Sequence, residues 1–155
     1  MASAVSVGVL ASLSTADVRG RLDDDRVLGV VGAACDVMRA TVVGLPVRGP
    51  AEVRAEILSD QNTAVERMIA AVERLDERVR ASDRPLEAWL ADWERVLDAR
   101  QAYAIAVDGG SREPFAVPTA PDGEPLTVRI EAAAGGACDV PDVVGDPGAY
   151  ADQQV

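Results

Sequence analysis

The feature that most constrains the fold is a set of three segments in which apolar side chains recur at steps of three and four residues. This spacing gathers side chains on one face of an α-helix, so each segment predicts an amphipathic helix. The helices are expected at residues 24–43, 50–82 and 85–108. The apolar stripe of the first consists of Leu28, Val31, Cys35, Met38 and Val42.

Glycine and proline mark the predicted helix ends. Gly44 and Pro46 follow the first segment, Pro50 opens the second, and Gly109 follows the third. Because the connections are short, neighbouring helices should be antiparallel, which predicts an all-α, three-helix up-down-up bundle. The second segment would reach roughly 48 Å as one helix, so it is expected to overhang, bend or break near residues 59–62.

The chain loses its helical periodicity after Gly109. Six of its nine prolines fall between residues 109 and 148, a composition typical of irregular structure. This part is predicted to be a C-terminal wrap lying on the bundle rather than a second domain. Residues 125–134 fit either a short helix or a strand, and the helix is favoured.

The two ends differ from the helical domain expected at residues 22–145. Residues 1–21 form an apolar segment whose first sixteen residues carry no charge. It fits either a frayed tail or first helical turn, or the outer end of a membrane helix that begins upstream of Met1. Residues 146–155 are predicted to be an acidic tail.

Composition excludes several classes of function. The chain has no His and no Lys, which removes His-dependent catalytic relays, His-containing metal sites and lysine Schiff bases. Its net charge of −11 argues against nucleic acid and anionic membrane surfaces as partners. We therefore expect no enzymatic activity, no metal and no cofactor.

The two cysteines have contrasting surroundings. Cys35 lies on the stripe of the first helix, and Cys138 lies in the irregular C-terminal part. A bridge between them would attach the wrap to the bundle. Two separate buried thiols in a cytosolic protein are the alternative, and cysteine spacing alone leaves both open.

Arg100 falls on the otherwise apolar face of the third helix. A buried guanidinium needs a partner, and Asn62 or Glu66 on the second helix could supply one. A structural polar pair that sets helix register is the simplest interpretation, while a ligand-facing or snorkelling arginine is the alternative. If a ligand pocket exists, its candidate lining is Trp89, Trp93, Arg100 and Tyr103.

Four stretches carry a family resemblance: Asp92–Ala104, Pro114–Pro118, Asp122–Ile130 and Cys138–Pro141. They make the chain similar to uncharacterised small exported or membrane-anchored helical proteins of high-GC actinobacteria, over roughly residues 22–145. The resemblance implies a preceding membrane helix, a bridge between Cys35 and Cys138, and no attached activity. It also implies structural roles for Trp93, Arg100 and Tyr103.

These observations lead to two functional expectations. The first is a non-enzymatic extracytoplasmic interaction or accessory domain of the cell envelope, with an unidentified protein partner and membrane contact only through a possible N-terminal anchor. The second is a small-molecule or lipid-binding module with a pocket between the third helix and the wrap. A cytoplasmic adaptor with free thiols is the alternative to the extracytoplasmic location.

Overall fold

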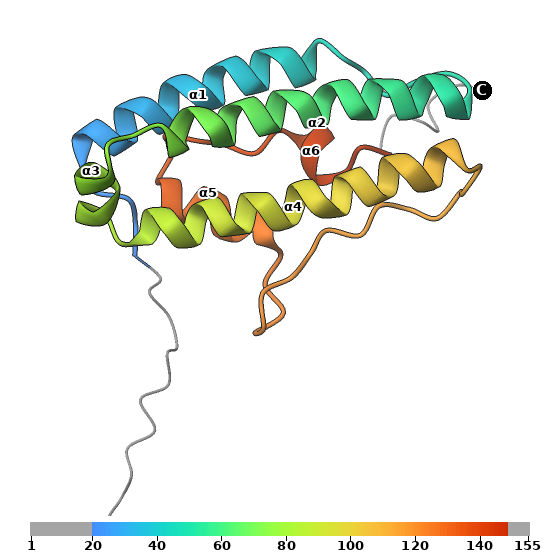
Figure 1. Ribbon diagram of the computed structural model, residues 1–155. Coiled ribbons are helices and arrows are strands. Elements are labelled where there is room, and N and C mark those ends of the chain that lie inside the picture. The colour runs from blue at the N-terminus through green and yellow to red at the C-terminus, as the bar shows by residue number, and fades with distance from the viewer. Residues whose placement is uncertain (1–19, 149–155) are drawn as a thin grey trace, which may run out of the picture.

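The computed structural model describes residues 20–148, and every named element in that range is a helix. Three long helices run up, down and up (Figure 1). They are α1 (Asp25–Val43), α2 (Ala51–Glu73) and α4 (Pro85–Asp108), and the short helices are α3 (Glu77–Ser82), α5 (Leu126–Ala134) and α6 (Asp142–Gly145). The predicted all-α bundle of three main helices is confirmed.

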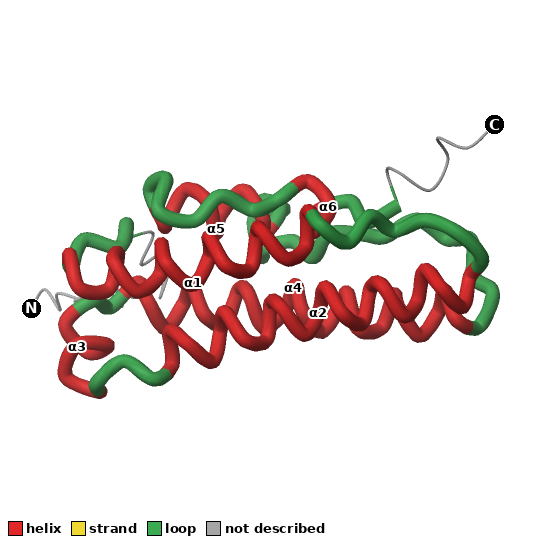
Figure 2. The backbone as a smooth tube through the Cα atoms, turned by 90° about the horizontal axis from the view of Figure 1, so that it is seen from above, coloured by secondary structure: helices red, strands yellow, loops and turns green. Residues whose placement is uncertain are grey.

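The C-terminal wrap, residues 109–148, takes the position that a fourth helix would have in a bundle. Helix α2 packs against both α1 and α4, whereas α5 packs against α4 and α6 contacts α1. Seen from above, α5 and α6 lie on the opposite side of α1 from α2 (Figure 2). The apolar core is therefore enclosed by three helices and the wrap together.

The buried stripe of α1 differs from the prediction in its first turn. Val27 is fully buried, whereas Leu28 packs only at the edge of the core. Val27 extends the line through Val31 and Cys35 at four-residue steps, and Leu28 is turned about 100° away from it. The rest of the predicted stripe is buried as expected.

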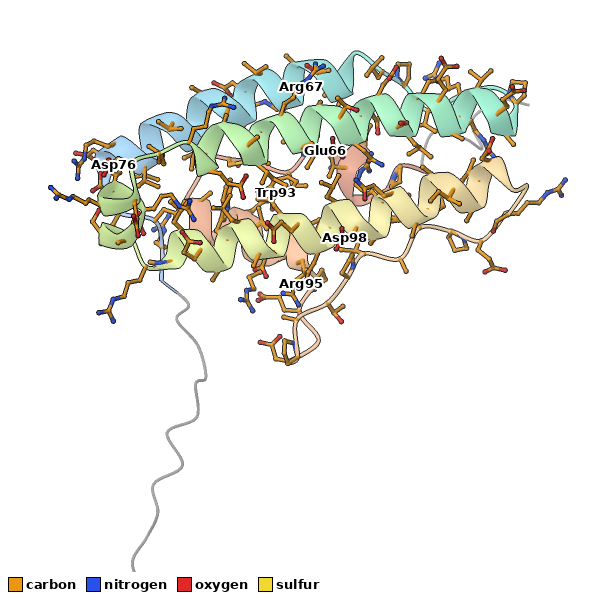
Figure 3. All side chains as sticks on the ribbon, in the orientation of Figure 1. Glu66, Arg67, Asp76, Trp93, Arg95 and Asp98 are labelled. Carbon is orange, nitrogen blue, oxygen red and sulfur yellow. A yellow bond between two sulfur atoms is a disulfide. The ribbon has the colours of Figure 1, made fainter. Side chains whose placement is uncertain are left out.

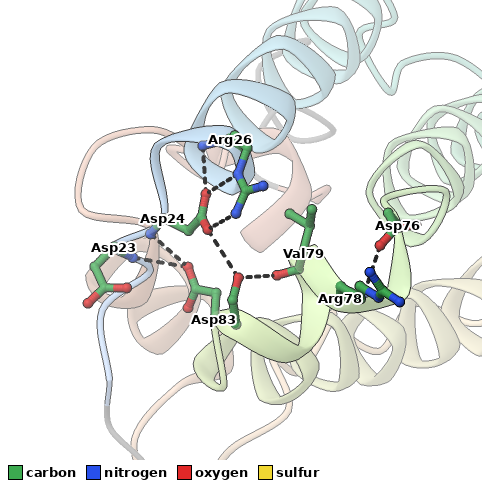
Figure 4. Close-up of polar contacts among 8 residues, drawn as sticks. Asp23, Asp24, Arg26, Asp76, Arg78, Val79 and Asp83 are labelled. Atoms are coloured by element: carbon green, nitrogen blue, oxygen red, sulfur yellow. Dashed lines mark hydrogen bonds and ion pairs between the residues drawn. The ribbon is translucent and has the colours of Figure 1, made fainter.

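The second predicted helix, for which an overhang, a bend or a break near residues 59–62 was expected, breaks after Glu73 instead. Helix α2 runs without interruption through residues 59–62 and ends at Glu73, and α3 begins after a short turn. The prediction was wrong because Gln61 and Asn62 are buried and point into the bundle instead of ending the helix. The new start is set by Asp76, whose carboxylate accepts a hydrogen bond from the backbone N–H of Arg78 (Figure 4).

A carboxylate joins the turn before α4 to the start of α1. Asp83 is buried, and its Oδ2 accepts the backbone N–H groups of Asp23 and Asp24 at 3.0 and 3.2 Å. Asp24 in turn caps α1 by accepting from the backbone of Arg26, and Ser82 donates to its other oxygen (Figure 4). These bonds satisfy amide groups that a helix start leaves open.

The wrap contains the helix favoured for residues 125–134. Leu126, Ile130 and Ala134 are buried at four-residue steps, which is the spacing of one helical face. The helix ends at Gly135, whose φ of 59° is a left-handed conformation that glycine adopts without strain. The wrap is thus less irregular than expected, although its connections are long.

A disulfide bond joins Cys35 to Cys138, with the two Cα atoms 5.5 Å apart. Both residues belong to the buried core. The bond attaches the wrap to α1 across a sequence separation of 103 residues. Such bonds persist in oxidising surroundings, so the bridge indicates an oxidising environment.

Residues 1–19 and 149–155 lie outside the described range. Most of the predicted apolar N-terminal segment, residues 1–21, and most of the predicted acidic tail, residues 146–155, therefore fall outside it. Among the described helices, none is long and apolar enough to cross a membrane.

Candidate functional site: a buried arginine beneath an acidic groove

The centre of the candidate site is Arg100, which is completely buried on α4. Its Nε donates to Oδ1 of Asn62 at 2.9 Å, and its Nη2 donates to Oε1 of Gln61 at 2.6 Å. Its Nη1 donates to the backbone carbonyls of Val143 and Val144 at 3.1 and 2.9 Å. All four acceptors are uncharged, so the arginine links α2, α4 and α6 without an ion pair.

Burial lowers the pKa of Arg100 to about 10, because desolvation disfavours the charged form of the guanidinium. The group nevertheless stays protonated at neutral pH, since this pKa is well above 7. Gln61 extends the network by donating from Nε2 to the carbonyl of Leu45 at 2.7 Å. The arginine thus connects α4 to the turn after α1 as well.

Of the two predicted partners of Arg100, only one contacts it. Asn62 bonds to it, whereas Glu66 accepts a hydrogen bond from Gln101 at 2.8 Å on the surface. Gln61 is the partner that sequence reasoning missed. Its position three residues after Leu58 and four before Val65, both buried, could have revealed that it faces the core.

The four residues predicted to line a pocket do not meet in one. Trp89 and Trp93 are core residues whose rings form an edge-on pair with centroids 6.1 Å apart. Trp89 also donates from Nε1 to the carbonyl of Ile130 at 3.2 Å. Tyr103 lies about four turns further along α4, where its ring packs edge-on against Phe115 at 5.4 Å.

An open groove of about 600 Å³ runs between α2 and α4. Its walls combine small apolar residues, such as Ala55 and Ala104, with Ile105, which is 75% exposed. Four carboxylates line it: Glu52, Glu56, Glu66 and Asp108. Figure 3 shows Glu66 on the side of α2 that faces α4. We call this feature the acidic groove.

Asn62 connects the acidic groove to the buried network below it. It lines the groove although only 3% of the residue is exposed. Its Oδ1 is used by Arg100, while its Nδ2 has no hydrogen-bond partner within residues 20–148. The amide therefore offers a fixed donor at the floor of the groove.

Two cavities lie between α4 and the wrap. One, of about 240 Å³, is lined by Trp89, Arg21 and Asp92 among others. Asp92 is buried and accepts from Arg95 at 2.5 Å and from Arg129 at 2.7 Å, so its charge is already compensated. The second, of about 640 Å³, lies beside Tyr103 and extends to the start of α2.

Across residues 20–148, no group of three or more His, Cys, Asp or Glu side chains is arranged to hold a metal ion. No protein-family model, curated protein or solved structure matches this chain.

Proposed function

We propose that this protein is a non-enzymatic, extracytoplasmic interaction or accessory domain of the actinobacterial cell envelope, and that the acidic groove is its contact surface. The observation that carries the proposal is the combination, in one groove, of four carboxylates with the exposed side chain of Ile105. This arrangement, an apolar centre within a polar rim, is the one that protein interfaces have.

The partner that fits this groove is a protein segment with Arg or Lys on one side and aliphatic residues on the other. Its cations would face Glu52, Glu56 and Asp108, and its aliphatic residues would cover Ile105. The Nδ2 of Asn62 would donate to a carbonyl oxygen of the segment. The overall charge of −11 would speed the approach of such a partner.

Two further observations support the location. The disulfide indicates an oxidising environment, which for a bacterial protein favours the outside of the cytoplasmic membrane. The resemblance to exported or membrane-anchored actinobacterial proteins points the same way. Attachment to the membrane through residues 1–21 remains part of the proposal.

Two synthetic amphipathic helices test the proposal, one built from Leu and Lys and the other from Leu and Glu. The full chain with its disulfide intact should bind only the Leu/Lys peptide in a fluorescence-anisotropy titration. Ile105→Ser and the double variant Glu52→Gln, Glu56→Gln should each weaken binding about tenfold or more, equal to about 1.4 kcal/mol.

The matched controls lie outside the acidic groove. Val128→Ser removes an exposed aliphatic side chain on α5, and Glu94→Gln removes an exposed carboxylate on α4. Both should bind the Leu/Lys peptide like the wild type. Absence of binding, or equal losses in groove and control variants, would refute the groove as the contact surface.

A small-molecule binding module is the second candidate function, supported by the 240 Å³ cavity between α4 and α5. Trp89 forms part of its wall, and Arg21 has no ion pair within the described range. A short-chain carboxylate such as hexanoate would suit this lining. Its binding should shift the tryptophan emission, whereas unchanged emission would argue against this candidate.

A further inference from the structure

The cavity of about 640 Å³ beside Tyr103 lies where the start of α2, the end of α4 and the wrap come together. This is the end of the bundle opposite α3 (Figure 1). The cavity is separate from the acidic groove, because Ala51 and Arg54 line the cavity whereas Glu52 and Ala55 line the groove. What binds in one need not bind in the other.

Two arginines, Arg54 and Arg112, line this cavity. Neither Arg54 nor Arg112 forms an ion pair within residues 20–148. The Nε of Arg54 is also shielded from solvent and has no hydrogen-bond acceptor in the described part of the chain. A guanidinium that forms no ion pair can bind an anion in the cavity through charge-assisted hydrogen bonds from its terminal amino groups.

The start of α2 adds backbone donors to the same cavity. Pro50 is the N-cap residue and supplies no side-chain hydrogen bond to the first turn, so the N–H groups of that turn remain without a capping side chain. Ala51, the first residue of the helix, lines the cavity. Such helix starts favour a negative charge through their dipole and their open N–H groups.

Two aromatic residues, Tyr103 and Phe115, also line the cavity. The rings of Tyr103 and Phe115 form an edge-on pair at 5.4 Å, and both residues are partly buried. A ligand that places an apolar group against these rings would bury surface that is now hydrated. Glu113 and Asp146 also line the cavity, and their charges disfavour a doubly charged ligand such as phosphate.

We infer that this cavity is a binding site for a small organic carboxylate. Arg54 and Arg112 hold the carboxylate together with the first turn of α2, and the apolar part of the ligand rests on Tyr103 and Phe115. The inference goes beyond the proposed interaction function, since it assigns a different site and a different class of ligand.

Benzoate is the probe, because it combines a single carboxylate with a planar apolar ring. The full chain is titrated with benzoate while the Nε–Hε resonances of its arginines are followed by NMR. The Arg54 resonance should shift and saturate, and Arg54→Gln and Arg112→Gln should each weaken binding about tenfold or more. Arg54→Lys, which keeps a positive charge, should retain part of the affinity.

Three controls make the result decisive. Benzamide, the neutral analogue of benzoate, and inorganic phosphate should not produce the saturable shift. Arg48→Gln removes an exposed arginine that precedes α2 but does not line the cavity, so it should bind like the wild type. The inference is overturned if benzoate leaves the Arg54 resonance unchanged, if benzamide or phosphate binds equally well, or if Arg48→Gln weakens binding as much as Arg54→Gln.

This test is independent of the acidic groove. Arg54→Gln should leave binding of the Leu/Lys peptide unchanged, and Ile105→Ser should leave binding of benzoate unchanged. Melting curves of every variant with its disulfide intact verify that the fold is retained. Failure of one proposal is therefore distinguishable from failure of the other.

Discussion

The Nη1 group of Arg100 donates to the carbonyl oxygen of Val144 at 2.9 Å and so attaches the wrap to the middle of α4. Six residues earlier in the wrap, Cys138 is bonded covalently to Cys35 on α1. The same stretch of chain is thus held from both sides of the bundle. Loss of either attachment should weaken the other.

Removal of the disulfide tests this coupling. The double variant Cys35→Ala, Cys138→Ala should lose about 2 to 5 kcal/mol of unfolding free energy, because the unfolded chain regains the freedom that a closure across 103 residues removes. Urea unfolding measures the loss. Hydrogen exchange at Val143 and Val144 should become faster than exchange in the middle of α2, and equal protection in both places would contradict the coupling.

Substitution of the buried arginine should be more damaging than that of a surface arginine. Arg100→Met removes four hydrogen bonds and leaves the side chains of Gln61 and Asn62 without their buried donor, which should cost about 3 kcal/mol or more. The control is Arg95→Met, because Arg95 is about half exposed and its partner, the buried Asp92, keeps its ion pair with Arg129. Its cost should stay below about 1 kcal/mol. Chemical unfolding gives both values, and similar losses would show that the buried network contributes no more than one half-exposed arginine.

The cap of α1 predicts a pH dependence. The side-chain hydrogen bond from Arg26, followed by the backbone hydrogen bond, holds the pKa of Asp24 well below the ordinary 3.8. A carboxylate with a lowered folded pKa stabilises the fold above its unfolded pKa and loses this effect as the pH falls. The difference in unfolding free energy between wild type and Asp24→Ala should therefore be largest near about pH 7 and shrink below about pH 4. A difference that is constant with pH would exclude this role of the carboxylate.

Two glycines should respond to alanine in opposite directions. Gly29 is an exposed position within α1, and a Cβ there would meet no atom within 4 Å, so Gly29→Ala should stabilise the protein by about 1 kcal/mol. Gly135 has a φ of 59°, and a Cβ there would lie 2.7 Å from Nη2 of Arg21. Gly135→Ala should therefore destabilise by about 1 kcal/mol. Thermal melting of the pair tests both signs.

Local pattern predicted most of the helices. The end of α1 at Val43 and the full extent of α4 follow from apolar periodicity together with the Gly and Pro residues that flank each helix. The short helix α5 was also favoured on its spacing. A bend or break was expected near residues 59–62 instead of after Glu73, because the polar pair Gln61 and Asn62 resembles a helix interruption when its buried partner is not known.

The candidate site was harder to predict than the fold. The position of Arg100 on the apolar face of its helix predicted that this arginine is buried. A buried arginine needs a polar partner, and Asn62 on the second helix was one of two candidates. The carbonyls of Val143 and Val144 could not be predicted, since a backbone acceptor has no signature in the sequence and these two lie more than forty residues from Arg100. The four residues predicted to line one pocket lie apart. Helical spacing shows that residues share a face of α4, but Trp89 and Tyr103 lie far apart along that face and have different neighbours.

The sequence by itself determined the helical periodicity, the helix ends, the absence of His and Lys chemistry and the acidic charge, because each depends on neighbouring residues or on composition. The tertiary structure alone decided which uncharged groups surround Arg100, where α2 ends, and which side chains line the acidic groove and the cavity beside Tyr103. These features arise from contacts between segments far apart in the chain, and such contacts form only when the three helices and the wrap enclose a common core.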